Sequence, residues 1–67
     1  MKWWRIAVVA TGSKSIVWFV ECYARSKPRA IATAKGTLTA TDPENYTFDV
    51  VDSLPTTQQS EGLISIR

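Results

Sequence analysis

The sequence predicts an α+β domain of ββαβ order, in which one helix packs on one face of an antiparallel sheet of three or four strands. Two runs that alternate apolar and polar residues are joined by a short turn, which is typical of a hairpin. A segment with helical spacing of alanines and larger apolar residues follows, and then a third alternating run. Residues 1–55 are expected to form this single domain, and residues 56–67 a polar tail or a short additional strand.

The first two strands are expected at residues 3–11 and 15–24, and each has one apolar face. Gly12 in the turn between them is free to adopt a positive φ. Trp3 and Trp4 are neighbours, so a register shift of one residue would exchange their faces, and which of them faces the core stays open. The residues assigned to the core are Trp4, Ile6, Val8, Ala10, Ile16, Trp18, Val20, Cys22 and Ala24.

A helix is expected directly after the second strand. Ser26 is a suitable N-cap, and Pro28 fits the first turn, where its missing N–H costs little. Helical spacing places four residues against the sheet: Ala30, Ile31, Ala34 and Leu38. The helix is expected to end near Ala40, and the third strand covers residues 46–53 and stops before Pro55.

The composition argues against catalysis and against metal or cofactor binding. The 67 residues include one cysteine and no histidine, so intramolecular disulfides are excluded and the commonest general base is missing. Asp49 and Asp52 are the closest acidic pair in a strand, but a separation of three places them on opposite faces. We therefore expect no enzyme, no cofactor and no metal site.

Location and charge also bear on function. The apolar run at residues 6–10 is too short for a membrane span, and Arg5 precedes it, so a soluble cytoplasmic protein without membrane contact is expected. The net charge of +2 is unevenly distributed, because residues 1–35 carry +6 and residues 36–67 carry −4. Such asymmetry indicates either a basic binding face or ordinary solvation of charged side chains.

A single helix leaves the other sheet face uncovered, and this face carries aromatic side chains beside basic ones. Soluble monomers rarely expose a large apolar patch, so a protein partner or a second copy in a homodimer is expected to cover it. A nucleic-acid-binding module that stacks bases on the aromatic rings is the alternative. The candidate binding residues are Trp3, Arg5, Phe19 and Tyr23 on this face and the basic cluster Arg25, Lys27 and Arg29 at the helix start.

The stretch from the second strand to the third resembles a known group of proteins. The matching positions are Tyr23-Ala24, Ser26, Ala30-Ile31 and Ala34, followed by Phe48-Asp49-Val50 and Pro55. They resemble small phage-encoded ββαβ proteins, among them the inhibitors of host RNA polymerase from T-odd coliphages. The resemblance implies a compact phage or mobile-element protein, acting in the host cytoplasm, that inhibits or modulates a host complex of the transcription or defence machinery.

The resemblance does not extend to the residues with which those inhibitors contact their target. Two arginines in their last strand matter for binding RNA polymerase, and the matching positions here are Asp52 and Leu54. The acidic character of that group is also missing. The resemblance therefore implies the fold and a mode of action, binding to a host complex, and leaves the particular target open.

Overall fold

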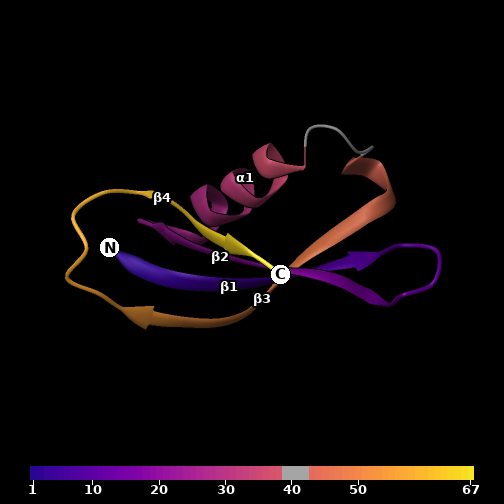
Figure 1. Cartoon of the computed structure of the whole chain (residues 1–67), viewed down its shortest axis with the longest axis horizontal. Coiled ribbons are helices and arrows are strands. Elements are labelled where there is room, and N and C mark those ends of the chain that lie inside the picture. The colour runs from indigo at the N-terminus through magenta and orange to yellow at the C-terminus, as the bar shows by residue number, and fades with distance from the viewer. Residues whose placement is uncertain (39–42) are drawn as a thin grey trace.

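The chain folds into a four-stranded antiparallel sheet with one helix on one face, as the computed structural model shows for residues 1–38 and 43–67 (Figure 1). The elements in order are β1 (Lys2–Ala10), β2 (Ile16–Ala24), α1 (Lys27–Thr37), the short 3-10 helix η1 (Pro43–Asn45), β3 (Tyr46–Pro55) and β4 (Gly62–Ile66). The strand order is β3-β1-β2-β4. The predicted α+β fold is confirmed, and its fourth strand pairs with β2.

The central strands β1 and β2 form a long hairpin. Ala10 donates a backbone hydrogen bond to Ser15 (2.9 Å), and Lys14 donates one to Ala10 (2.7 Å), which closes the turn. The positive φ of this turn lies at Lys14 (58°), whereas Gly12 has none, so the expectation for Gly12 was wrong. Sequence cues place a turn well, but the residue that takes the left-handed conformation depends on how the strands close it.

The helix begins at its predicted N-cap, but of the four residues expected against the sheet only three are buried, and Ile31 is half-buried outside the core. The Ser26 hydroxyl accepts a hydrogen bond from the N–H of Arg29 (3.4 Å), which satisfies one free donor of the first turn. Ala30 and Ala34 are fully buried against the sheet. Their small side chains let the backbones of the helix and the strands approach closely. The described helix ends at Thr37, with Leu38 as its C-cap, and the predicted end near Ala40 lies outside the described residues.

The core lies between α1 and the sheet, and its tryptophan is Trp4. The indole N–H of Trp4 donates to the carbonyl oxygen of Ala24 (3.0 Å), so the one polar atom of this buried side chain is satisfied. The buried residues of this cluster are Trp4, Ile6, Val8, Val20, Cys22, Ala24, Ala30, Ala34 and Leu38. Trp18, Tyr46, Phe48 and Val50 pack at its margin.

One residue assigned to the core is exposed. The pairing of β1 with β2 shifts between Val8 and Val9, so that Val8 lies opposite Trp18 but Val9 lies opposite Ile16. This irregularity takes Ile16 out of the alternation, and the residue is 54% exposed. The assignment of Ile16 to the core was therefore wrong.

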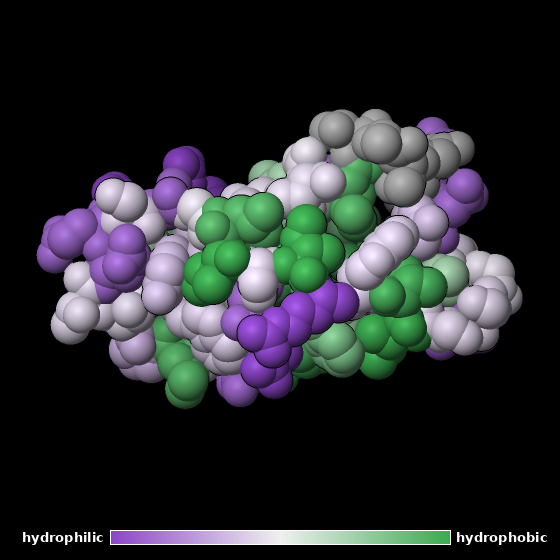
Figure 2. Space-filling view, viewed as in Figure 1, coloured by the Kyte–Doolittle hydropathy of each residue, from purple (hydrophilic) through white to green (hydrophobic). Residues whose placement is uncertain are grey.

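Several large apolar side chains remain at the surface, and Figure 2 shows them as separate green patches between hydrophilic residues. They lie mainly at the hairpin end and along the two edge strands, β3 and β4. Within the described parts of the chain, no helix is long and apolar enough to cross a bilayer.

Candidate functional site: the sheet face opposite the helix

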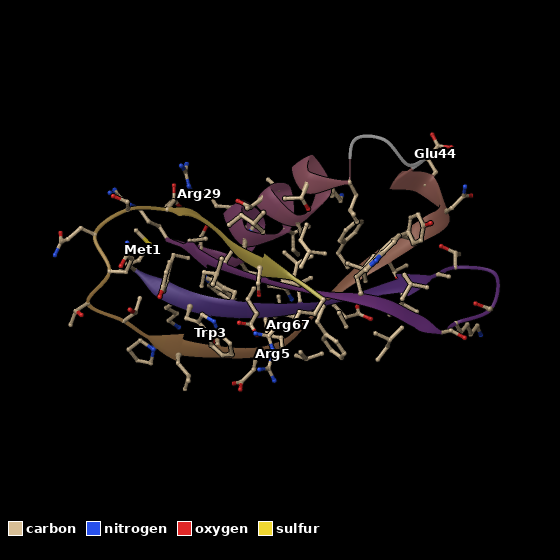
Figure 3. All side chains as sticks on the ribbon, in the orientation of Figure 1. Met1, Trp3, Arg5, Arg29, Glu44 and Arg67 are labelled. Carbon is tan, nitrogen blue, oxygen red and sulfur yellow. The ribbon has the colours of Figure 1, made fainter. Side chains whose placement is uncertain are left out.

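The candidate site is the sheet face that α1 does not cover, here called the open face. Side chains alternate along a strand, so the neighbours of the core residues in β1 and β2 project to this side. Its members include Trp3, Arg5, Phe19, Glu21, Tyr23 and Arg67. Four of the seven residues singled out from the sequence therefore share one face. In Figure 3 the labelled Trp3, Arg5 and Arg67 lie together near the lower strands, while Arg29 lies at the level of the helix.

Strand register places the open-face side chains in cross-strand pairs. Trp3 lies opposite Tyr23, and Arg5 lies opposite Glu21. Phe19, which is 37% exposed, lies opposite the small residue Ala7. Ala7 is fully buried although it belongs to this face, because larger neighbours cover it. The register of β1 and β2 therefore fixes which aromatic and charged side chains of the open face are neighbours.

Two contacts hold the side chain of Arg5. Its guanidinium carbon lies 5.3 Å from the centre of the Trp3 ring, and its Nη2 lies 3.4 Å from Oε1 of Glu21. Each contact is worth about 0.5–1 kcal/mol at an exposed site, or less for the ion pair. Together they restrict the rotamers of Arg5. A partner that binds Arg5 therefore meets a side chain that is already oriented.

Arg67 brings a second guanidinium to the same place. Phe19 and Arg67 exchange both backbone hydrogen bonds (2.7 and 2.8 Å), which fixes the end of β4 beside the ring of Phe19. Arg5, Phe19, Glu21 and Arg67 line a hollow of about 190 Å³. Within the described residues the Arg67 side chain has no hydrogen bond or ion pair, so it remains available to a partner.

Acidic side chains also belong to this face. Asp49 of β3 lies opposite Ala7, and Asp52 lies opposite Arg5. The pairing of β1 with β3 shifts between Arg5 and Ile6, so both carboxylates lie on the open face, and the expectation that they lie on opposite faces was wrong. With Glu21, three carboxylates accompany the two guanidinium groups of Arg5 and Arg67. The open face is therefore mixed in charge, not basic.

The basic cluster at the start of α1 forms a separate location. Arg29 donates from Nε to both carboxylate oxygens of Glu61 (2.9 and 2.8 Å) and from Nη2 to Oε1, and the backbone N–H of Arg25 donates to Oε2 (2.8 Å). These bonds hold the pKa of Glu61 at about 2, well below its usual value. The side chain of Arg29 is thus occupied by Glu61, whereas Lys27 is exposed.

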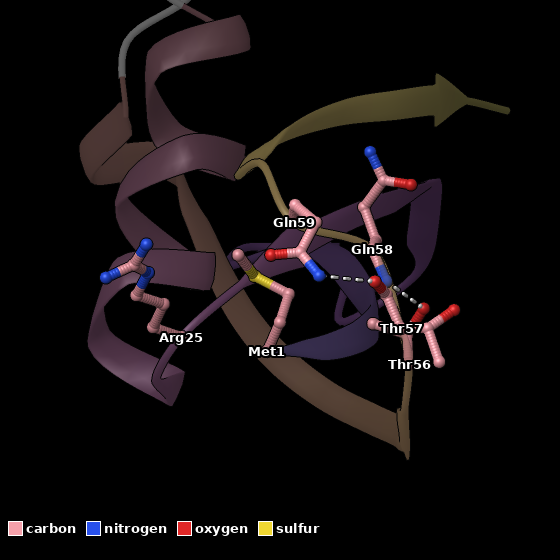
Figure 4. A pocket seen from close by; sticks show the side chains of 6 residues that line it. All are labelled: Met1, Arg25, Thr56, Thr57, Gln58 and Gln59. Atoms are coloured by element: carbon pink, nitrogen blue, oxygen red, sulfur yellow. Dashed lines mark hydrogen bonds between the residues drawn. The ribbon is translucent and has the colours of Figure 1, made fainter.

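Arg25 contributes to a polar pocket beside the N-terminus, with a volume of about 500 Å³ (Figure 4). The lining residues are Met1, Arg25, Thr56, Thr57, Gln58 and Gln59. Two of its hydrogen bonds are local to the loop, from the Gln58 N–H to the Thr56 hydroxyl (3.2 Å) and from the Gln59 amide to the Thr57 carbonyl (3.5 Å). The pocket is therefore shaped by the connection between β3 and β4.

Glu61 clamps this connection to the helix start, and its removal has a predictable pH signature. Its folded pKa of about 2 lies below the usual 4.5, so the stabilisation is complete above about pH 4.5 and is lost as the pH falls towards 2. Glu61→Gln should lower the melting temperature at neutral pH. The melting temperature of this variant should also fall less than that of the unmodified protein between about pH 4.5 and pH 2. Thermal unfolding followed by circular dichroism from neutral to acidic pH measures both effects.

Asp49→Asn removes one carboxylate that has no described bond to the helix start, and it serves as the control for the Glu61 variant. In this variant the melting temperature should fall at acidic pH as it does in the unmodified protein. Equal pH profiles for the Glu61→Gln variant and the unmodified protein would contradict the clamp.

The single thiol lies in the core, between the sheet and α1. Cys22 is fully buried, and burial raises the pKa of its thiol, with a smaller contribution from the Glu61 carboxylate. Its nearest polar contact is the carbonyl oxygen of Ala30 at 4.0 Å. These surroundings disfavour the reactive thiolate. Among the described residues, no group of three or more His, Cys, Asp or Glu side chains is placed to hold a metal ion.

Arg67 and Glu61 are functional candidates that the sequence reasoning missed. Both lie in the segment expected to be a polar tail or a short strand, and their contacts reach back to Phe19 and Arg29. The charges that flank the apolar run 63–66 were the available signal. Comparison with protein-family models, curated proteins and solved structures finds no match for the chain.

Proposed function

We propose that this chain is a small, non-catalytic binding protein that recognises another protein through the open face. The resemblance to small phage-encoded ββαβ proteins makes a host complex of the transcription or defence machinery the proposed target, with inhibition or modulation of that complex as the outcome. Arg5, Phe19 and Arg67 are the proposed central contacts. Trp3 and Tyr23 flank them.

The observation that supports this proposal most is the restrained arginine beside an exposed ring. Tryptophan, tyrosine and arginine are the residue types that dominate binding energy at protein interfaces. Arg5 lies against Trp3 and Glu21, so less side-chain entropy is lost when a partner binds it. Phe19 adds exposed apolar area next to the guanidinium of Arg67, which has no hydrogen bond or ion pair to any described residue.

The charge pattern favours a protein over a nucleic acid as partner. A phosphate backbone requires a surface that neutralises several negative charges. The acidic residues Glu21, Asp49 and Asp52 belong to the open face and would repel it. A folded protein, whose own surface carries both signs of charge, can match such a mixed pattern.

Capture from a bacterial lysate tests the class of partner. The tagged protein, incubated with nuclease-treated lysate, should retain a protein complex at physiological salt and should not bind short RNA or DNA in a direct assay. Retention that depends on intact nucleic acid, or an affinity for RNA or DNA that falls steeply with salt, would contradict the proposal and favour the nucleic-acid alternative.

A further inference from the structure

The connection between β3 and β4 crosses one end of the sheet. Because β3 and β4 are the two edge strands, residues 56–61 pass the start of β1 and the end of β2 (Figure 1). The N–H of Thr56 donates to the carbonyl oxygen of Met1 (3.4 Å), and Glu61 is bound to Arg29 at the other end of the connection. The polar pocket of about 500 Å³ lies between this connection and the ends of β1 and β2. Both ends of the connection are therefore fixed, and the pocket belongs to the folded structure.

One wall of the pocket carries a positive charge without an ion-pair partner. The backbone N–H of Arg25 binds Glu61, but the guanidinium of Arg25 makes no hydrogen bond or ion pair with any described residue. Its charge still acts on Glu61, which is paired with Arg29, so two guanidinium groups share one carboxylate. Lys2 and Lys27 lie close to lining residues in the chain and add positive charge at this end of the molecule. Among the described residues no acidic side chain lines the pocket, so an anion would meet an uncompensated cation.

The other wall carries neutral groups that form hydrogen bonds. The Thr56 hydroxyl accepts from the N–H of Gln58, which leaves its own O–H hydrogen available to donate. The Thr57 hydroxyl and the side-chain amide of Gln58 have no hydrogen bond to any described residue. Hydroxyl and amide groups both donate and accept, and so complement the hydroxyl groups of a polar ligand. In Figure 4 these three residues lie on one side and Arg25 on the other, with Met1 between them.

The cationic wall suits a phosphate group better than a carboxylate. A phosphate monoester carries a charge of about −1.5 to −2 at neutral pH and three acceptor oxygens. A carboxylate carries a single charge on two oxygens. A guanidinium can bind phosphate through two parallel hydrogen bonds, and the further basic residues nearby favour the more highly charged group. The pocket volume falls within the range of about 300–1,000 Å³ that is usual for sites of small molecules.

We propose that this pocket binds a small phosphate monoester that also carries hydroxyl groups, of the sugar phosphate class. The phosphate lies at the guanidinium of Arg25, and the hydroxyl groups lie at Thr57 and Gln58. The proposal does not depend on the partner binding described above, because none of the central contacts of the open face lines this pocket.

Titration of the isotope-labelled full chain with ribose 5-phosphate, followed by two-dimensional NMR at constant ionic strength, tests the site. The backbone amide signals of residues 56–59 and the side-chain Nε–H signal of Arg25 should shift and reach saturation. Ribose and inorganic phosphate are titrated separately, and each should bind more weakly than ribose 5-phosphate, because each lacks one of the two parts that the pocket recognises.

Arg25→Gln should weaken the binding of ribose 5-phosphate by about tenfold or more, because it removes the charge and the paired donors. Thr57→Val should weaken it by about threefold, and this variant keeps the test valid if Arg25→Gln disturbs the start of the helix. Lys14→Gln is the matched control, since it removes the same charge from the exposed hairpin turn at the other end of β1, and it should bind as the unmodified protein does. The amide spectrum shows whether each variant is folded.

Three results would each overturn the proposal. The first is that millimolar ribose 5-phosphate causes no shift that saturates. The second is that ribose or inorganic phosphate binds as tightly as ribose 5-phosphate. The third is that the folded Arg25→Gln and Thr57→Val variants bind it as tightly as the Lys14→Gln control.

Discussion

Replacing Trp4 with alanine is expected to remove a large part of the free energy of unfolding. The buried indole fills the space between sheet and helix and donates its N–H to Ala24, so its loss leaves a cavity and an unpaired carbonyl. Truncation of a buried tryptophan costs about 3–5 kcal/mol. A chain of this size has a total stability of only about 3–10 kcal/mol, so the variant loses about a third of it or more. Urea unfolding followed by circular dichroism measures the difference.

Trp3→Ala is the matched control, because it removes the same side chain one residue away on the open face. It forfeits the contact with Arg5, worth about 0.5–1 kcal/mol, and the protein should remain folded. Similar losses for the two variants, or a larger loss for Trp3→Ala, would show that the faces of β1 are reversed.

The faces of the strands followed from the sequence because alternation has a period of two in any strand that is buried on one side. The assignments of Ile6, Val8 and Val20 depended on this alone, and all three lie in the core. Alternation could not decide which of the adjacent Trp3 and Trp4 faces the core. The register with β2 separates them, since it places Trp4 opposite the buried Cys22.

The features that the sequence did not predict depend on contacts between distant residues. The exposure of Ile16 results from a register shift between two strands, which no local pattern encodes. The clamp between Glu61 and Arg29 joins residues 32 positions apart. Arg67 joins the open face only because β4 pairs with β2 and brings it to Phe19. Each depends on how the strands pair, and not on the type of residue.

The largest expected effect on binding comes from the two aromatic residues of β2 on the open face. Phe19→Thr combined with Tyr23→Thr removes both rings, and threonine is itself a β-branched residue that strands favour. Truncation of a central interface residue costs about 2 kcal/mol or more, so the double variant should lose about 100-fold or more in affinity. The protein should remain folded, because neither side chain belongs to the core.

Ile16→Thr is the control for this pair, since Ile16 is also exposed and apolar but lies at the hairpin end of β2. It should bind the partner as the unmodified protein does. Far-ultraviolet circular dichroism and a thermal melt confirm that every variant is folded before its binding is compared.

The most direct test of the binding face is the amount of partner that the folded Phe19→Thr/Tyr23→Thr variant retains from a bacterial lysate, relative to the Ile16→Thr control. Binding through the open face predicts that the control retains the partner and the double variant does not. A double variant that is folded and retains the partner as well as the control would contradict the assignment of binding to the open face.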